Sequence, residues 1–254
     1  MQLPTMFVAC DGALATLHLY RTERLNAFGN QGTLDLNTAA DALAADERVR
    51  VVVITGEGRA FSTGIDLKEL AAGEIDMTNH HRWEAALRKF ELMNKVVIAA
   101  INGYCLGGGL QLALACDIRV AAESALLGLP AVKEGLIPGM GVYRLPRTIG
   151  IGRAKRLILS GELVTGPEAH AMRMVDYCVS DLYFSHKVRE VASAFINIPW
   201  ASVLLSKQMT NRTFDLSYDD FLQEYFGAQA QAMQSDDHRT AMQAYREEQA
   251  GRKK

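Results

Sequence analysis

Three consecutive glycines, Gly107–Gly109, constrain the fold of this chain more than any other feature of its sequence. They lie in the segment NGYCLGGGLQLALA (residues 102–115), between an apolar stretch and a helix-forming one. Glycine permits unusual backbone angles and lets another group approach the main chain closely. At a helix start, such a segment directs unpaired N–H groups and the positive end of the helix dipole toward one point. We therefore expect a site here for an oxygen atom that carries or develops negative charge.

A second glycine-bearing segment, FSTGIDLKEL (residues 61–70), follows a predicted strand and leads into a predicted helix. Asp66 is placed as the N-cap of that helix. The loop before it offers a further backbone donor, the N–H of Ile65. We expect the N–H groups of Ile65 and Gly108 to converge on one carbonyl oxygen. Two such donors form an oxyanion hole suited to thioester enolates, and loss of one donor typically costs about 10²–10³ in rate.

Short apolar runs alternate with helical patterns over the first part of the chain, which predicts an α/β layer structure. The predicted strands are Met6–Ala9, Ala13–Tyr20, Val51–Ile54, Val96–Ile101, Asp117–Ala121 and Met174–Val179. The predicted helices are Gly29–Ala45, Trp83–Met93, Gly109–Ala115, Gly152–Ser160 and Pro167–Met172.

Beyond Val179 the pattern contains no buried strand, and three helices are expected: Tyr183–Phe195, Trp200–Asn211 and Tyr218–Glu248. We therefore predict a core over residues 1–197 and a C-terminal helical region over residues 198–254. The second region is rich in Met, Gln, Ala and aromatic residues, so we expect it to pack against its own core or a neighbouring subunit.

Composition favours a soluble cytoplasmic protein, with 49% hydrophobic and 22% charged residues and a net charge of −2. That charge gives no reason to expect a nucleic-acid partner or a membrane surface. The four cysteines show no CxxC pairing, and no apolar run reaches the roughly 20 residues that a membrane helix needs. Histidine and cysteine spacings match no metal site, and GxSxG, GxGxxG and P-loop motifs are absent.

Taken together and in order, the motifs resemble the enoyl-CoA hydratase/isomerase superfamily, the crotonases. The resemblance rests on residues 61–70 and 102–117, on RLNAF (residues 24–28) and on GLIPGMG (residues 135–141). It implies a crotonase-type spiral of repeated β-β-α units with a C-terminal α-helical trimerisation region. It also implies a homotrimer or a dimer of trimers, an acyl-CoA thioester substrate and an oxyanion hole at Ile65 and Gly108. No metal or separate cofactor is expected, because coenzyme A enters as part of the substrate.

By the same resemblance, further residues are expected to bind the substrate. Arg24 is placed near the phosphates of coenzyme A, Lys68 near its adenine, and Tyr245 closes over it from a neighbouring subunit. The full predicted binding set is Arg24, Ala27, Gly64, Asp66, Lys68, Gly107, Gln111, Ala131 and Tyr245.

Two departures from the family pattern affect the chemistry. Hydratases of the family position water with two glutamates, and the corresponding residues here are Gln111 and Ala131. Neither an amide nor a methyl group acts as a general base at neutral pH. Glu134, three residues after Ala131, is the best remaining base candidate if the segment makes a helical turn; the alternative is a solvated charge pair with Lys133.

His80 and His81 fall in the variable segment that lines the acyl pocket in this family, but their polar surroundings favour a solvated helix start. The expected activity is that of an enoyl-CoA isomerase-like enzyme with altered chemistry, a lyase or isomerase of CoA thioesters. Decarboxylation and slow hydration are alternative reactions. A different class of function is a non-catalytic acyl-CoA-binding or assembly subunit.

Overall fold

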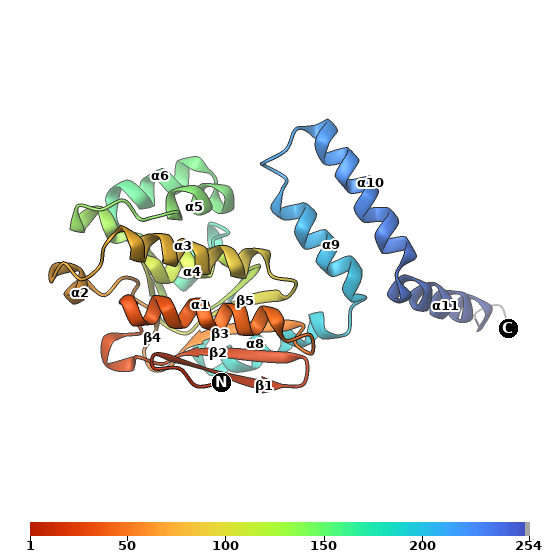
Figure 1. Ribbon diagram of the computed structural model, residues 1–254, viewed down its shortest axis with the longest axis horizontal. Coiled ribbons are helices and arrows are strands. Elements are labelled where there is room, and N and C mark those ends of the chain that lie inside the picture. Colours follow the sequence, from red (N-terminus) through yellow and green to blue (C-terminus); the bar gives the residue numbers. More distant parts are fainter. Residues whose placement is uncertain (252–254) are drawn as a thin grey trace. The chain divides into compact units, whose positions relative to one another are not determined.

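The computed structural model describes residues 1–251, which divide into two compact units, Met1–Ile196 and the chain from Asn197 onward. The first unit contains all the strands found in the described residues, and the second contains helices alone (Figure 1).

The larger sheet of the first unit has six strands in the order β1-β2-β3-β5-β7-β10. Only β1 and β2 pair antiparallel, and the other neighbours run parallel. The apolar run Val51–Ile54 is buried in β3, as expected for a strand covered on both faces. The strands are β1 (Met6–Asp11), β2 (Leu14–Leu19), β3 (Val51–Gly56), β5 (Val96–Ile101), β7 (Ile118–Ala122) and β10 (Tyr177–Val179).

A second sheet has four short strands in the order β4-β6-β8-β9, namely β4 (Ala60–Ser62), β6 (Tyr104–Leu106), β8 (Leu126–Gly128) and β9 (Leu163–Thr165). After α1, three successive turns of the spiral each give one strand to the large sheet, the next strand to the small sheet, and then a helix. The successive turns are β3-β4-α2, β5-β6-α4 and β7-β8 followed by a 3-10 helix over Pro130–Glu134. The predicted α/β spiral of β-β-α units is therefore confirmed.

Helices cover both faces of the large sheet. Leu17, Leu19 and Ile54 pack into the core on the side of α1, whereas Thr16 and Val53 line a small cavity against α8. In Figure 1, α1 and α3 lie side by side. The helices of this unit are α1 (Asn30–Ala45), α2 (Leu67–Ala71), α3 (Met77–Leu92), α4 (Gly108–Ala115), α5 (Gly141–Ile149), α6 (Ile151–Ser160), α7 (Gly166–Ala171) and α8 (Asp181–Ile196).

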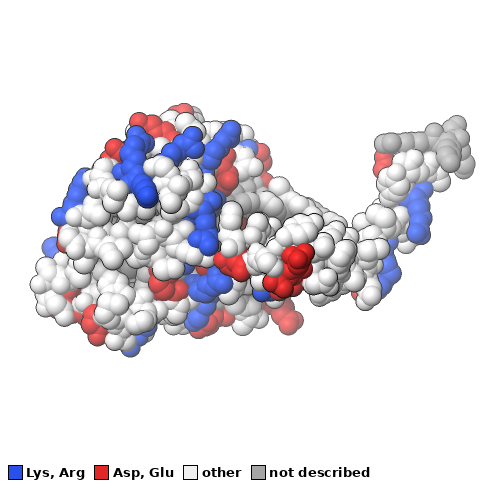
Figure 2. Space-filling view, turned by 90° about the horizontal axis from the view of Figure 1, so that it is seen from above, with Lys and Arg blue, Asp and Glu red and all other residues white. Residues whose placement is uncertain are grey.

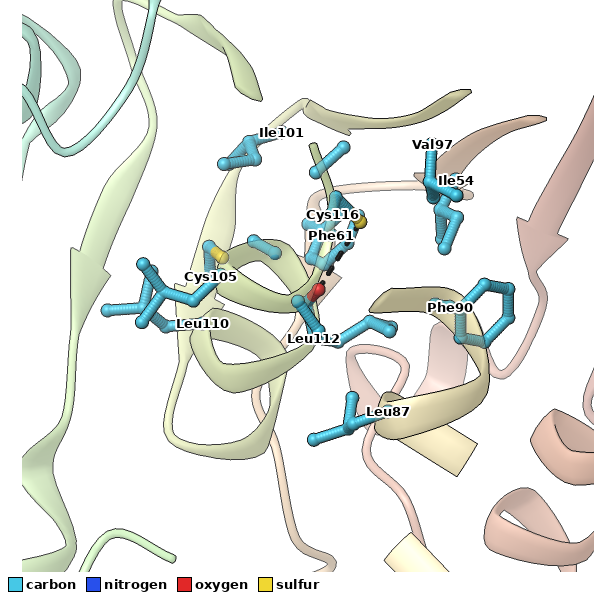
Figure 3. Packing of buried hydrophobic residues seen from close by; sticks show 14 of the residues in the cluster. Ile54, Phe61, Leu87, Phe90, Val97, Ile101, Cys105, Leu110, Leu112 and Cys116 are labelled. Atoms are coloured by element: carbon cyan, nitrogen blue, oxygen red, sulfur yellow. Dashed lines mark hydrogen bonds between the residues drawn. The ribbon is translucent and has the colours of Figure 1, made fainter. Parts of the chain in front are cut away.

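The helix α4 is almost entirely buried, with every residue from Gly109 to Ala115 inside the first unit. Figure 3 shows Leu110 and Leu112 packed with Phe61, Cys105 and other core residues. The Cys116 thiol at its end donates to the Leu112 carbonyl over 3.3 Å, and burial raises the pKa of the Cys105 thiol well above its usual range. This packing fixes the position of the glycine turn that begins the helix.

The second unit consists of α9 (Trp200–Asn211), α10 (Tyr218–Gln234) and α11 (Asp236–Gly251). The single helix predicted over residues 218–248 is wrong, because Ser235 adopts an extended conformation with φ −68° and ψ 152°. Its hydroxyl accepts from the His238 N–H over 3.1 Å and so stabilises the start of a new helix.

Charged side chains of both signs are interspersed on the surface drawn in Figure 2, in keeping with the small net charge of −2. No single helix within residues 1–251 is long and apolar enough to cross a membrane; only α8 and α9, counted as a bent pair, meet the criteria of length and composition.

Candidate active site

The two glycine turns identified in the sequence meet at one place in the first unit. Both contain a glycine in the left-handed region, with φ +88° at Gly64 and φ +51° at Gly107. A Cβ atom on Gly64 would lie 2.5 Å from the Gly108 nitrogen and 2.8 Å from the Leu106 carbonyl oxygen. Such distances leave no room for a side chain, so the contact of the two loops requires glycine.

The backbone around Ile65 orients its N–H group. Phe28 and Ile65 form an isolated parallel β-bridge. The Phe28 N–H donates to the Gly64 carbonyl over 2.7 Å, and the Phe28 carbonyl accepts from the Asp66 N–H over 2.9 Å. In extended chain, alternate peptide groups point to opposite sides, so the Ile65 N–H points away from Phe28. Gly108 is the first residue of α4, where an N–H has no partner within the helix. Neither N–H donates a backbone hydrogen bond within residues 1–251.

A cavity of about 240 Å³, here called the Trp83 cavity, opens beside these two donors. Ile65, Gly107 and Gly108 line it, as do the two positions where hydratases carry glutamates, Gln111 and Ala131. The remaining lining residues are largely apolar and come from the start of α1, from α3 and from the loop before α5: Phe28, Thr33, Asn79, His80, Trp83, Glu84, Leu136, Ile137, Pro138, Gly139 and Met140.

The side-chain amide of Gln111 is buried and held in one orientation. The Trp83 indole N–H donates to its Oε1 over 3.3 Å, and an indole nitrogen is only a donor, so the oxygen must face it. The Nε2 group has no hydrogen-bond partner among residues 1–251 and is accessible to solvent. The amide therefore presents N–H donors, rather than a base, to the Trp83 cavity.

Two titratable side chains, His80 and Glu84, line this cavity among the described residues. They lie one turn apart on α3, so they share a helix face. Glu84 Oε2 pairs with Nη1 of the buried Arg144 over 2.9 Å, and its Oε1 accepts from the Met140 N–H over 3.4 Å. Arg144 Nε also binds Glu91 over 2.5 Å. Burial lowers the pKa of Arg144, but the two carboxylates outweigh burial and raise it above its ordinary value.

A second cavity of about 340 Å³, here called the Lys68 cavity, adjoins the first and shares Ile65, Gly107, Ala131 and Leu136 with it. Its other lining residues include Arg24, Asp66, Lys68 and Glu134. Glu134 does lie in a helical turn, as supposed, but it is exposed and lines the Lys68 cavity rather than the cavity of Gln111. Two cations beside an adjoining apolar space suit a ligand with phosphate groups at one end.

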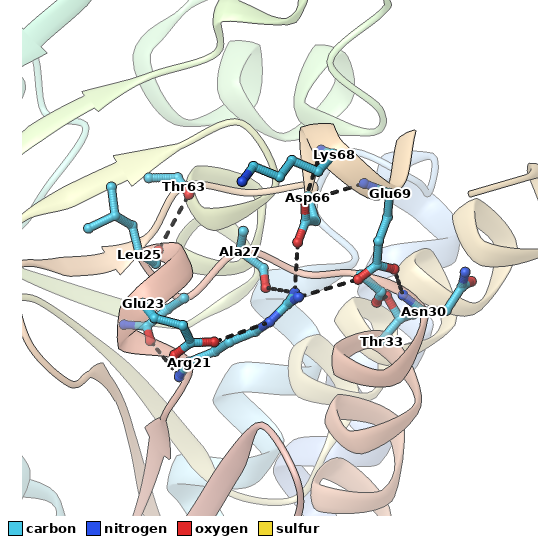
Figure 4. Close-up of polar contacts among 12 residues, drawn as sticks. Arg21, Glu23, Leu25, Ala27, Asn30, Thr33, Thr63, Asp66, Lys68 and Glu69 are labelled. Atoms are coloured by element: carbon cyan, nitrogen blue, oxygen red, sulfur yellow. Dashed lines mark hydrogen bonds and ion pairs between the residues drawn. The ribbon is translucent and has the colours of Figure 1, made fainter. Parts of the chain in front are cut away.

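Behind the Ile65 loop, Arg21 joins several segments that shape the site (Figure 4). Its guanidinium lies 2.9 Å from Asp66 Oδ2, 3.4 Å from Glu69 Oε1 and 3.2 Å from the Ala27 carbonyl oxygen. Asp66 caps α2, accepting from the N–H groups of Lys68 and Glu69. Burial raises the pKa of Asp66, but these hydrogen bonds and the charge of Arg21 more than offset that effect and lower it.

The structure thus brings most of the predicted residues into two adjoining cavities. Gly64 lies at the contact of the loops, and Ala27 contributes its carbonyl to Arg21. Tyr245 lies on α11 of the second unit, and its place over coenzyme A stays a prediction. Sequence reasoning missed Arg21, Trp83, Glu84 and Arg144. The helical spacing of His80, Trp83 and Glu84 is the signal that could have placed them on one face of a helix. The predicted helix began only at Trp83, whereas α3 begins at Met77.

Within the described residues, no three His, Cys, Asp or Glu side chains come together in a way that could hold a metal ion.

Comparison with known proteins gives a consistent result over most of the chain. The family model for enoyl-CoA hydratase/isomerase matches residues 10–252.

Individual relatives agree with the family match. The chain is 30% identical over 251 residues to a short-chain-enoyl-CoA hydratase of Clostridium acetobutylicum, covering 96% of this chain and 95% of the relative. It is 38% identical over 186 residues to the 2,3-dehydroadipyl-CoA hydratase of Escherichia coli, covering 72% and 73%. A crystal structure of an enoyl-CoA hydratase from Bacillus anthracis superimposes with a TM-score of 0.91 at 31% identity, covering 96% of each chain. The chain belongs to the enoyl-CoA hydratase/isomerase family, and its fold is the crotonase fold.

Proposed function

We propose that this protein binds an acyl-CoA thioester, forms its enolate and moves a proton along the acyl group, shifting a carbon–carbon double bond. The thioester oxygen accepts from the N–H groups of Ile65 and Gly108, and the acyl group lies in the Trp83 cavity. The coenzyme A portion lies along the Lys68 cavity, where Arg24 meets its phosphates and Lys68 lies near its adenine end. The relatives named as hydratases support the substrate class.

The observation that carries this proposal is the pair of unpartnered N–H groups where the two glycine turns meet. Backbone donors held in a fixed, partly buried position stabilise negative charge as it develops, with little reorganisation. Because this stabilisation depends on no side chain, it persists although both glutamate positions have changed. A double-bond shift needs the oxyanion hole and one proton-carrying group, so it requires the fewest additional groups.

Slow hydration is the second candidate, and the amide of Gln111 is the observation that favours it. Its Nε2 group can donate to a water or a hydroxyl group in the Trp83 cavity, although it cannot remove a proton. Decarboxylation to an enolate would use the same oxyanion hole without a strong base.

The test is turnover of a panel of 2-enoyl-, 3-enoyl-, 3-hydroxyacyl- and carboxyacyl-CoA thioesters, followed in time by chromatography and mass spectrometry. Interconversion of 2-enoyl and 3-enoyl thioesters at unchanged mass is the expected result. A gain of 18 mass units would indicate hydration, and a loss of 44 decarboxylation. Tight binding of these thioesters without any turnover would contradict the proposal and indicate a non-catalytic acyl-CoA-binding subunit.

A further inference from the structure

We infer that His80 is the catalytic residue that carries the proton, in place of the carboxylates that hydratases of this family use. This inference rests on the proposed function, because it requires the acyl group to occupy the Trp83 cavity. His80 and Glu84 are the titratable side chains that line this cavity within residues 1–251. Their hydrogen-bonding states decide between them.

Glu84 is already committed to the protein. Its two oxygens are held by the buried Arg144 and by the Met140 N–H. To take up a proton, the Glu84 carboxylate must weaken its ion pair with Arg144. That costs free energy, because the guanidinium is buried and has little access to water. Glu84 is therefore a positioning residue, which ties α3 to α5 and to the loop over the cavity.

The His80 ring, in contrast, makes no hydrogen bond to any residue of the described chain, 1–251, and is half-buried at the cavity wall. Imidazole is the side chain that most often transfers protons near neutral pH. In neutral imidazole, one ring nitrogen can accept a proton from carbon while the other remains a hydrogen-bond donor.

The backbone that carries His80 is firmly placed. Asp76 caps α3 through the Asn79 N–H over 3.1 Å. The buried Asn79 amide binds Asn30 over 2.9 Å and Thr33 over 3.3 Å, which ties the first turn of α3 to α1. A group held on a rigid element keeps the geometry that proton transfer requires.

The inferred step conserves protons and electrons. The C2–H bond of a 3-enoyl thioester breaks, its proton moves to the His80 nitrogen, and its electron pair becomes a dienolate whose oxygen lies between Ile65 and Gly108. The imidazolium then returns the same proton to C4, which leaves a 2-enoyl thioester and neutral imidazole. A saturated thioester can undergo only the first half of this sequence, and its C2 proton then exchanges with solvent.

Exchange at C2 of butanoyl-CoA in D₂O, followed by mass spectrometry, tests the inference. We compare the wild type with His80→Ala, Glu134→Ala and His81→Ala, the last being an exposed neighbour on α3 that lines neither cavity. His80→Ala should lose about 10²–10⁴ in exchange rate, as expected for loss of a general base, and added imidazole should restore part of it. His81→Ala should stay within about twofold of the wild type, and Glu134→Ala, which tests the alternative base, should keep far more exchange than His80→Ala.

The outcomes separate this inference from the proposed function. Exchange by the wild type that survives in His80→Ala, or that is lost in Glu134→Ala, overturns the role of His80 and leaves enolate formation in place. A wild type that binds butanoyl-CoA without exchanging its C2 proton, and that also interconverts no 2-enoyl and 3-enoyl thioesters, overturns both. Binding of butanoyl-CoA by His80→Ala, measured by calorimetry, checks that the variant keeps a folded site.

Discussion

At the residue scale, Gly64 is a position where a single added methyl group would press directly on a proposed donor. It combines φ +88° with a Cβ position 2.5 Å from the Gly108 nitrogen, one of the two proposed donors. Gly64→Ala should displace that donor and lower kcat/KM on the true substrate by about 10²–10³, the usual cost of losing one oxyanion-hole donor. Steady-state kinetics on the substrate identified by turnover measures the effect.

Gly12→Ala is the matched control, because Gly12 has φ +57° in the β1–β2 turn and nothing lies within 4 Å of its Cβ position. Both variants pay the cost of a side chain at positive φ, about 1–2 kcal/mol of stability. Only Gly64→Ala should lose activity. Unchanged kcat/KM in a folded Gly64→Ala would refute the placement of the oxyanion hole.

Gln111 and Ala131 give a second prediction at this scale. Both line the Trp83 cavity, so two carboxylates there would face the same space, as the resemblance to hydratases requires. The double variant Gln111→Glu, Ala131→Glu should hydrate a four-carbon 2-enoyl-CoA about 10²-fold faster than the wild type, since general acid–base catalysis contributes about 10²–10⁴. Loss of enoyl absorbance measures the rate.

The double variant Gln111→Glu, Ala131→Gln is the control, since it adds one carboxylate and a side chain of similar size to glutamate. It should fall well below the two-carboxylate variant. Equal rates for the two would show that the pair of glutamates is not what this site lacks for hydration.

At the scale of elements, the Asp66 carboxylate links α2 to Arg21 and thereby holds the Ile65 loop. Its pKa is lower in the folded chain than in the unfolded chain, so its contribution is fully present above the ordinary aspartate pKa of about 3.9. That contribution is lost as the pH falls through the depressed folded value. Asp66→Asn keeps a capping side chain but removes the charge, and should cost about 2 kcal/mol near pH 7.

Urea unfolding of the wild type and Asp66→Asn at a series of pH values tests this prediction. The two unfolding free energies should differ near pH 7 and approach each other below about pH 4, where the wild-type carboxylate takes up a proton. A difference that stays constant down to pH 3 would mean that the charge of Asp66 contributes nothing to folding.

Most elements of the first unit could be predicted because their sequence patterns are local. The strands Val51–Gly56 and Val96–Ile101 are apolar and β-branched, and α4 follows directly from its glycine turn. The helix α5 was not predicted, since it follows a glycine-rich loop and contains Pro146. The beginning of α3 at Met77 was missed as well, because polar residues hide the apolar spacing in its first turn.

The backbone geometry around the two proposed donors could be predicted for the same reason, because the glycine turns that meet there reveal it. The side chains around the donors were harder, because they depend on contacts between distant segments. Arg144 reaches Glu84 across 60 residues, and Trp83 reaches Gln111 across 28. Nothing in either local segment indicates such a contact. The polar neighbours of His80 in the sequence predict a solvated side chain, whereas in the structure it is partly buried and lines a largely apolar cavity.

At the scale of the whole molecule, the part of the second unit that the structure describes, up to residue 251, has no buried core of its own. Within the described residues, α9, α10 and α11 contain no buried side chain. Three aromatic side chains of this unit are largely exposed: Phe214 at 71%, Tyr218 at 78% and Phe226 at 56%. Exposed aromatic residues on a helical segment that buries so little favour assembly with other copies. The homotrimer or dimer of trimers that the resemblance implies stays a prediction, and these exposed residues give a way to test it.

We therefore expect light scattering after size exclusion to give about three or six times the chain mass of 27.9 kDa. Phe226→Asp should lower that mass, because a buried carboxylate without a partner opposes association. Leu182→Asp is the control: Leu182 is also exposed, at 98%, but it lies on α8, outside the helices through which assembly is expected, so its replacement should leave the mass unchanged. A wild type that runs at 27.9 kDa across a hundredfold range of concentration would contradict assembly through these helices. If assembly holds and Phe226→Asp also weakens CoA binding, the predicted closure over coenzyme A by Tyr245 of a neighbouring copy gains support.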